Sequence, residues 1–171
     1  SGEIAYGFGE VTGSNTAGRV ISAAIGYSAK PANVRLAYYR ANGSSLSAPD
    51  ASSSVMVAGN WDFGVAKIHA AYADSDEFFN RKFRDYLIGA SIPFGPHTVL
   101  LSYIFKDDRS ALNRDASQFG IGYTYALSKR TNLYASWANI DNKRGAIYSV
   151  GNNSETGTSD TAFNVGVRHK F

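Results

Sequence analysis

Apolar and polar residues alternate one by one along most of the chain, in segments separated by polar or glycine-containing connections. A period of two is typical of β-strands that have one apolar and one polar face. No helix is predicted. The alternation predicts ten strands, at residues 3–9, 19–29, 33–41, 53–62, 65–74, 84–93, 98–107, 117–127, 131–140 and 161–171. So high a strand content is unusual for an ordinary globular domain and favours a closed sheet.

The connections between these strands alternate in length. The predicted long, polar ones are Glu10–Gly18, Asn42–Ser52, Ser75–Arg81, Asp108–Ala116 and Asp141–Asp160. The predicted tight ones are Lys30–Ala32, Phe63-Gly64, Phe94–His97 and Ser128–Arg130. In a membrane β-barrel one rim carries long loops and the other short turns, and about ten tilted residues span the bilayer. We therefore predict an all-β fold, an antiparallel transmembrane β-barrel built as an up-and-down meander.

The two faces of the predicted strands differ in charge. From the second strand onward, the central positions of the more apolar face contain no Asp, Glu, Lys or Arg, whereas the other face carries Arg35, Asp62, Lys67, Asp85, Lys106, Arg168 and Lys170. Alternation alone does not distinguish a lipid-facing surface from the packed core of a soluble barrel. A soluble ligand-binding barrel therefore remains an alternative.

Aromatic residues favour the membrane interpretation, because they gather at both ends of the apolar face. Near the short turns these are Tyr27, Trp61, Phe94 and Tyr125, and toward the long connections they are Tyr38, Tyr72, Phe105, Phe119 and Phe163. Two such rows around an aliphatic band are typical of the aromatic girdles of a bilayer-spanning barrel.

Composition excludes several classes of protein. No apolar run approaches the roughly 18 residues of a transmembrane helix. The charge of +3, from 17 basic and 14 acidic residues, comes without the basic tracts of a nucleic-acid-binding face. The absence of Cys excludes disulfides, zinc–thiolate sites and thiol catalysis. The three histidines, His69, His97 and His169, have no metal-binding spacing, so neither a metal nor another cofactor is expected.

Four segments resemble a known family. The chain ends in Thr161–Phe171, an amphipathic strand with Phe171 as its last residue, and it contains the hairpin Tyr123–Tyr134 and the segments Tyr6–Glu10 and Gly89–Gly95. They resemble Gram-negative general diffusion porins of the neisserial and β-proteobacterial type. The resemblance implies a sixteen-stranded trimeric barrel in the bacterial outer membrane. Residues 1–171 would then be the C-terminal part of a single transmembrane barrel domain, with strands seven to sixteen.

The resemblance also implies a function without chemistry: a water-filled channel for passive diffusion of small hydrophilic solutes and ions, with a preference for anions. The expected pore-lining residues are Arg35, Lys67, His69, Arg168, Asp62 and Asp85, with rim charges at Arg40, Arg81, Lys82, Arg84, Lys106 and Arg109. The expected assembly signal, read by the barrel-assembly machinery, is Phe163, Val165, Val167, His169 and Phe171. The expected partners are outer-membrane lipid, two further copies of the protein and the N-terminal remainder of the barrel.

One alternative remains open within the membrane class. Ten strands could close into a complete small outer-membrane barrel that acts as an adhesin or a protease. A protease of this kind would use acidic residues and a histidine at the outer rim, where Asp74, Asp76 and Asp85 are expected to lie. His69, however, is expected nearer the middle of the wall.

Overall fold

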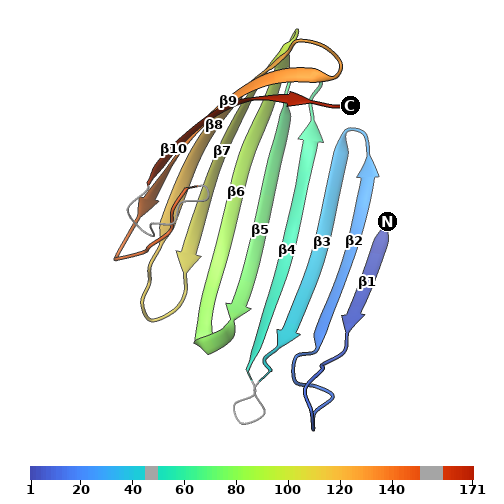
Figure 1. Cartoon of the computed structure of the whole chain (residues 1–171), viewed down its shortest axis with the longest axis vertical. Helices are drawn as coiled ribbons and strands as arrows, with labels where there is room; N and C mark the ends of the chain where they lie inside the picture. The colour runs from blue at the N-terminus through green and yellow to red at the C-terminus, as the bar shows by residue number, and fades with distance from the viewer. Residues whose placement is uncertain (45–49, 151–159) are drawn as a thin grey trace.

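The computed structural model describes residues 1–44, 50–150 and 160–171. They form one antiparallel ten-stranded sheet in which every strand pairs with its neighbours in chain order (Figure 1). The strands are β1 (Gly2–Gly7), β2 (Val20–Ala29), β3 (Ala32–Asn42), β4 (Ala51–Asp62), β5 (Lys67–Glu77), β6 (Arg81–Phe94), β7 (His97–Asp108), β8 (Ala116–Ala126), β9 (Thr131–Asn142) and β10 (Thr161–His169). The prediction of an all-β, up-and-down antiparallel meander is confirmed.

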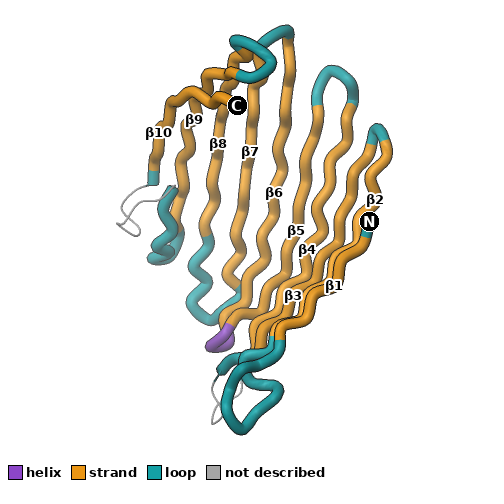
Figure 2. The backbone as a smooth tube through the Cα atoms, turned by 45° about the vertical axis from the view of Figure 1, so that its right-hand side comes forward, coloured by secondary structure: helices purple, strands orange, loops and turns teal. Residues whose placement is uncertain are grey.

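The sheet is curved and open (Figures 1 and 2). β1 and β10 lie at its two edges, and no pairing joins them in the part of the chain that the structure describes. The alternative of a closed ten-stranded barrel is therefore not the arrangement in this structure.

Long and short connections lie at opposite ends of the sheet (Figure 2). The short turns, such as Gly95-Pro96 between β6 and β7, lie at the upper end of Figure 1, and the long connections lie at the lower end. Residues 45–49 and 151–159, which belong to the predicted long connections Asn42–Ser52 and Asp141–Asp160, lie outside the described residues. We call the two ends the short-turn end and the long-loop end.

One predicted long connection was wrong. Where Ser75–Arg81 was expected as a loop, β5 and β6 continue and are joined by a one-turn 3-10 helix, Phe78–Asn80, although no helix was predicted. Cross-strand ion pairs support this extension: Lys82 Nζ lies 3.4 Å from Asp76, and Arg81 Nη1 lies 3.8 Å from Glu77. No helix of the described residues is long and apolar enough to cross a membrane.

The sheet has almost no buried core. In the described residues the buried apolar side chains are Ala17, Phe83, Ala116, Ile140, Ala146 and Val150. The apolar face is largely exposed instead, with Ile25 at 65%, Ile88 at 59% and Val165 at 64% exposure. Because a soluble barrel or sandwich buries its apolar face in a core, the soluble alternative does not fit this structure.

Candidate functional site

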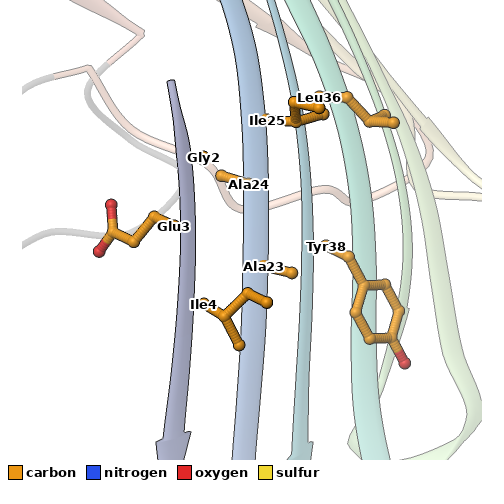
Figure 3. Close-up of a pocket in the computed structure, with 8 residues that line it drawn as sticks. All are labelled: Gly2, Glu3, Ile4, Ala23, Ala24, Ile25, Leu36 and Tyr38. Carbon is orange, nitrogen blue, oxygen red and sulfur yellow. The ribbon is translucent and has the colours of Figure 1, made fainter.

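The sheet presents an apolar face and a polar face, which the alternation of each strand separates. Figure 3 shows this at the edge strand, where Ile4, Ile25 and Tyr38 lie on one face and Glu3 points to the other. On the apolar side, a hollow of about 600 Å³ lies beside β1, and its lining includes Ile4, Ile25, Leu36 and Tyr38. We keep the names apolar face and polar face below.

An aromatic row crosses the apolar face near the long-loop end. Tyr72, Tyr86 and Phe105 oppose one another on β5, β6 and β7, with ring centroids 5.2 and 6.3 Å apart. One step beyond this row the same face becomes charged: Asp74 accepts hydrogen bonds from Tyr72 Oη and from Arg84 Nε, both at 3.0 Å. Two residues of a strand span about 7 Å, so the change from apolar to charged is sharp.

A second aromatic group lies at the short-turn end. The His97 ring stacks against Phe94 at 5.2 Å and lies 4.9 Å from the ring of Tyr125, and its Nδ1 is hydrogen-bonded to Tyr123 Oη at 2.6 Å. Sequence reasoning missed His97 and Tyr123 as members of this group, because only the pairing of β6, β7 and β8 brings them together.

The distance between the two aromatic ends matches a bilayer. On β6 the apolar face runs from Tyr86 to Phe94, eight residues or about 27 Å along the strand. A tilt of 35–45° reduces this to about 19–22 Å, close to the roughly 25 Å apolar band of membrane barrels.

The other predicted girdle residues also lie on the apolar face. Tyr27, Tyr38, Trp61, Phe119 and Phe163 have exposures of 68%, 37%, 47%, 44% and 69%.

One predicted pore-lining cation, Lys67, and one predicted rim cation, Lys106, are paired with carboxylates on the polar face. Lys67 Nζ lies 3.6 Å from Asp62, and Lys106 Nζ lies 3.0 Å from Asp85. Each pair is directly opposite in the strand register, which the sequence alone does not reveal. His69, next to Lys67 on this face, shares a 3.0 Å hydrogen bond with Ser91 Oγ.

Arg35 on β3 and Arg168 on β10 are polar-face cations whose charge is not compensated locally. No carboxylate of the described residues lies within 4 Å of either guanidinium. Arg35 lies across the backbone of Gly26, its partner on β2; a Cβ at Gly26 would be 3.1 Å from Arg35 Cγ. Sequence reasoning missed one opposing charge, Glu3, whose place in the alternation of β1 was the available signal.

The last connection covers part of the polar face at the long-loop end. Val150 packs on Ala116 and Ile140, and the Tyr148 backbone is hydrogen-bonded to the Asn142 amide at 2.7 and 3.2 Å. The Tyr148 ring lies 5.9 Å from Lys106 Nζ. Burial raises the pKa of the Tyr148 phenol, so this ring stays neutral beside the cation.

The acidic residues considered for catalysis are not brought to a histidine. Asp74 pairs with Arg84, Asp76 pairs with Lys82, and Asp85 pairs with Lys106. In residues 1–44, 50–150 and 160–171, no group of three or more His, Cys, Asp or Glu side chains is placed to hold a metal ion. The three carboxylates of the protease alternative are therefore held in ion pairs with Arg84, Lys82 and Lys106.

The terminal strand, β10, presents a row of exposed apolar side chains. Phe163, Val165 and Val167 lie on the apolar face of β10, with exposures of 64–69%. At the end of the strand His169 Nδ1 is hydrogen-bonded to Thr131 Oγ1 at 2.9 Å, and the rings of His169 and Phe171 lie 4.9 Å apart.

Comparison with known proteins identifies the family. Residues 1–146 match the family model described as Gram-negative porin. The chain belongs to the Gram-negative porin family. The expectation from the sequence that the chain is a Gram-negative porin is thereby confirmed.

Two relatives and one solved structure are similar to this porin chain. Outer membrane porin protein 32 of Delftia acidovorans is 33% identical over 132 residues, covering 68% of the chain and 36% of the relative. An outer membrane porin protein of Bordetella pertussis is 29% identical over 187 residues, covering 90% of the chain and 46% of that relative. The structure of an anion-selective porin from Comamonas acidovorans superposes with a TM-score of 0.83 at 25% identity, covering 99% of the chain and 55% of that porin.

The porin chain thus spans about half the length, or less, of the proteins that it matches. Its family and its relatives place it in the bacterial outer membrane. The open sheet corresponds to one continuous part of a porin barrel, since nearly all of it superposes on the solved porin.

Proposed function

We propose that the protein forms a water-filled channel for the passive diffusion of small hydrophilic solutes and ions, with a preference for anions. The observation that carries this proposal is the separation of the two faces. An exposed apolar face bounded by aromatic ends is suited to lipid, and the opposite, polar face is suited to water. The solute crosses the membrane unchanged, so the mechanism requires no catalytic residue and no cofactor.

Selectivity follows from the uncompensated charges of the polar face. Arg35 and Arg168 attract anions, and the negative charge of Glu3 weakens this attraction. In the Asp62–Lys67 and Asp85–Lys106 pairs the opposite charges largely cancel at a distance. Charges that line a low-dielectric wall raise the local concentration of counter-ions. The similarity to a porin that is itself anion-selective supports the same sign here.

Size exclusion involves the segment 143–150. It lies on the polar face at the long-loop end, with Val150 in contact with β8 and β9. Since the polar face lines the proposed channel, this segment narrows the channel mouth. Arg144 Nη1 fixes it to Asp115 of the preceding connection at 3.3 Å.

The rest of the barrel completes the channel in this proposal. Residues 1–171 form the C-terminal part of a single transmembrane barrel, and the free edges of β1 and β10 pair with strands of the N-terminal remainder. The barrel-assembly machinery recognises the apolar side chains of β10 together with Phe171. Three copies assemble into a homotrimer, and their apolar faces contact lipid and one another.

Reversal potentials in planar bilayers test this function. Under a KCl gradient the full-length protein should open large steps with an anion-biased reversal potential. The double variant Arg35→Gln/Arg168→Gln should lower the anion-to-cation permeability ratio at least about twofold. The matched double variant Asp62→Asn/Lys67→Gln removes a compensated pair and should leave the ratio nearly unchanged. Absence of conductance, or cation selectivity in the unmodified protein, would contradict the proposal.

A further inference from the structure

A hollow of about 600 Å³ lies on the polar face over β7–β10, in the half of the sheet toward the short turns. The side chains that line it from this face are Leu100, Thr124, Asn132, Tyr134, Ser136 and Arg168. Its volume is within the range of small-molecule sites. In the described part of the sheet it differs from the hollow in Figure 3, whose lining is almost entirely apolar.

Two large side chains make an apolar floor in this otherwise polar region. Tyr134 is 36% exposed and Leu100 is 39% exposed. Each lies across a glycine that opposes it on the next strand: a Cβ at Gly166 would be 2.6 Å from Tyr134 Cζ, and one at Gly122 would be 3.5 Å from Leu100 Cδ1. The two glycines therefore let both side chains lie against the wall, with one side open to the hollow.

The hollow also carries one cation and several neutral polar groups. Arg168 opposes Asn132 in the register of β9 and β10, and no carboxylate of the described residues lies within 4 Å of its guanidinium. Thr124 and Ser136 add hydroxyl groups to the lining. A guanidinium pairs well with a carboxylate, because its N–H groups match the two oxygens in a bidentate arrangement.

We infer that this hollow is a solute subsite for organic carboxylates that have a compact aromatic or aliphatic body. Arg168 binds the carboxylate, and the Tyr134 ring and Leu100 contact the apolar body, which stacks against the phenol ring. The inference rests on the proposed function, since a solute reaches the hollow only if the polar face lines the channel. It adds to simple charge filtering a discrimination between organic anions of equal charge.

Block of the chloride current by benzoate tests the subsite. Sodium benzoate is added to the short-turn side of the full-length protein in planar bilayers, and the concentration that halves the chloride current is measured. Benzoate should act at a concentration several times lower than acetate, which lacks the ring, and than benzamide, which lacks the charge. Arg168→Gln should raise the half-blocking concentration at least about tenfold. Tyr134→Ser should reduce the advantage of benzoate over acetate about threefold or more.

Controls separate the subsite from the channel itself. Lys129→Gln, in the exposed turn outside the hollow, removes the same charge and should leave the benzoate block unchanged. Arg168→Lys keeps the charge but lacks the planar guanidinium, so it should raise the half-blocking concentration of benzoate by an intermediate factor. This variant replaces Arg168→Gln if the latter does not assemble. Channels that conduct chloride but show equal block by benzoate and acetate would overturn the subsite and leave the proposed function standing. If the unmodified protein does not conduct, both fail.

Discussion

Two neighbouring alanines of β5 offer a matched test of which face contacts lipid. Ala70 lies on the exposed apolar face, opposite Gly59 and Ile88, and Ala71 lies on the polar face, opposite Ala58 and Leu87. Arginine at each position makes the same chemical change on opposite faces of one strand. Only the surroundings of the new charge differ between the two variants.

The expected cost follows from the depth of each position. Ala70 is two residues from Tyr72 in the aromatic row, about 5 Å below it along the membrane normal for a strand tilted by 35–45°. Arginine costs about 2–4 kcal/mol at the bilayer midplane and about 0–1 near the interface, so Ala70→Arg should cost about 2 kcal/mol. That is roughly a thirtyfold change in the folding equilibrium. Ala71→Arg faces water and should stay within about 0.5 kcal/mol.

Urea titrations of folding into phosphatidylcholine vesicles measure both variants of the full-length protein. Tryptophan fluorescence can follow the transition, because Trp61 and Trp137 lie on the apolar face. Equal costs at the two positions, or a larger cost for Ala71→Arg, would refute the assignment of the faces.

Three further predictions concern the mouth, the wall and the assembly of the channel. Tyr148→Ala removes the ring beside Lys106 and should increase the single-channel conductance; an unchanged conductance would show that segment 143–150 does not limit the mouth. Gly26→Val places a branched side chain under Arg35, which lies over Gly26 on the polar face, and should push the guanidinium into the channel. Single-channel recordings should show a lower conductance, although the net charge is unchanged. Phe171→Ser should lower the amount of folded barrel in cells but not the folding yield in vesicles; an equal loss in both would indicate a stability defect instead of a recognition defect.

In the proposed channel most of each strand is bounded by lipid on one side and water on the other, which explains why the strands could be predicted from the sequence. This boundary imposes the period of two that made β2 to β4 and β6 to β10 recognisable. Between Ser75 and Arg81 the constraint ends, since both faces are charged beyond the Tyr72–Tyr86 row. The alternation of apolar residues disappears there although the strands continue, so a loop was predicted wrongly.

Contacts on the polar face depended on register, which the sequence did not specify. Lys67 and Arg35 looked equivalent as wall cations, and only the pairing of β4 with β5 places Asp62 opposite Lys67. The contact of Tyr134 with Gly166 has the same origin, because it joins residues on adjacent strands. The family could be predicted from the resemblance of the sequence to porins. Which charges of the polar face are paired and which are not could be seen only in the structure.

Accessibility of single cysteines tests the central claim, that one face of this sheet lines water and the other contacts lipid. The chain contains no Cys, so its 171 residues contribute no background reaction. Six Ala→Cys variants compare the faces with one substitution: Ala37, Ala58 and Ala71 on the polar face, and Ala70, Ala90 and Ala135 on the apolar face. With a charged, membrane-impermeant thiol reagent on the protein in lipid vesicles, the polar-face cysteines should react and the apolar-face cysteines should stay protected. Equal reaction on both faces, or the reverse pattern, would contradict the account.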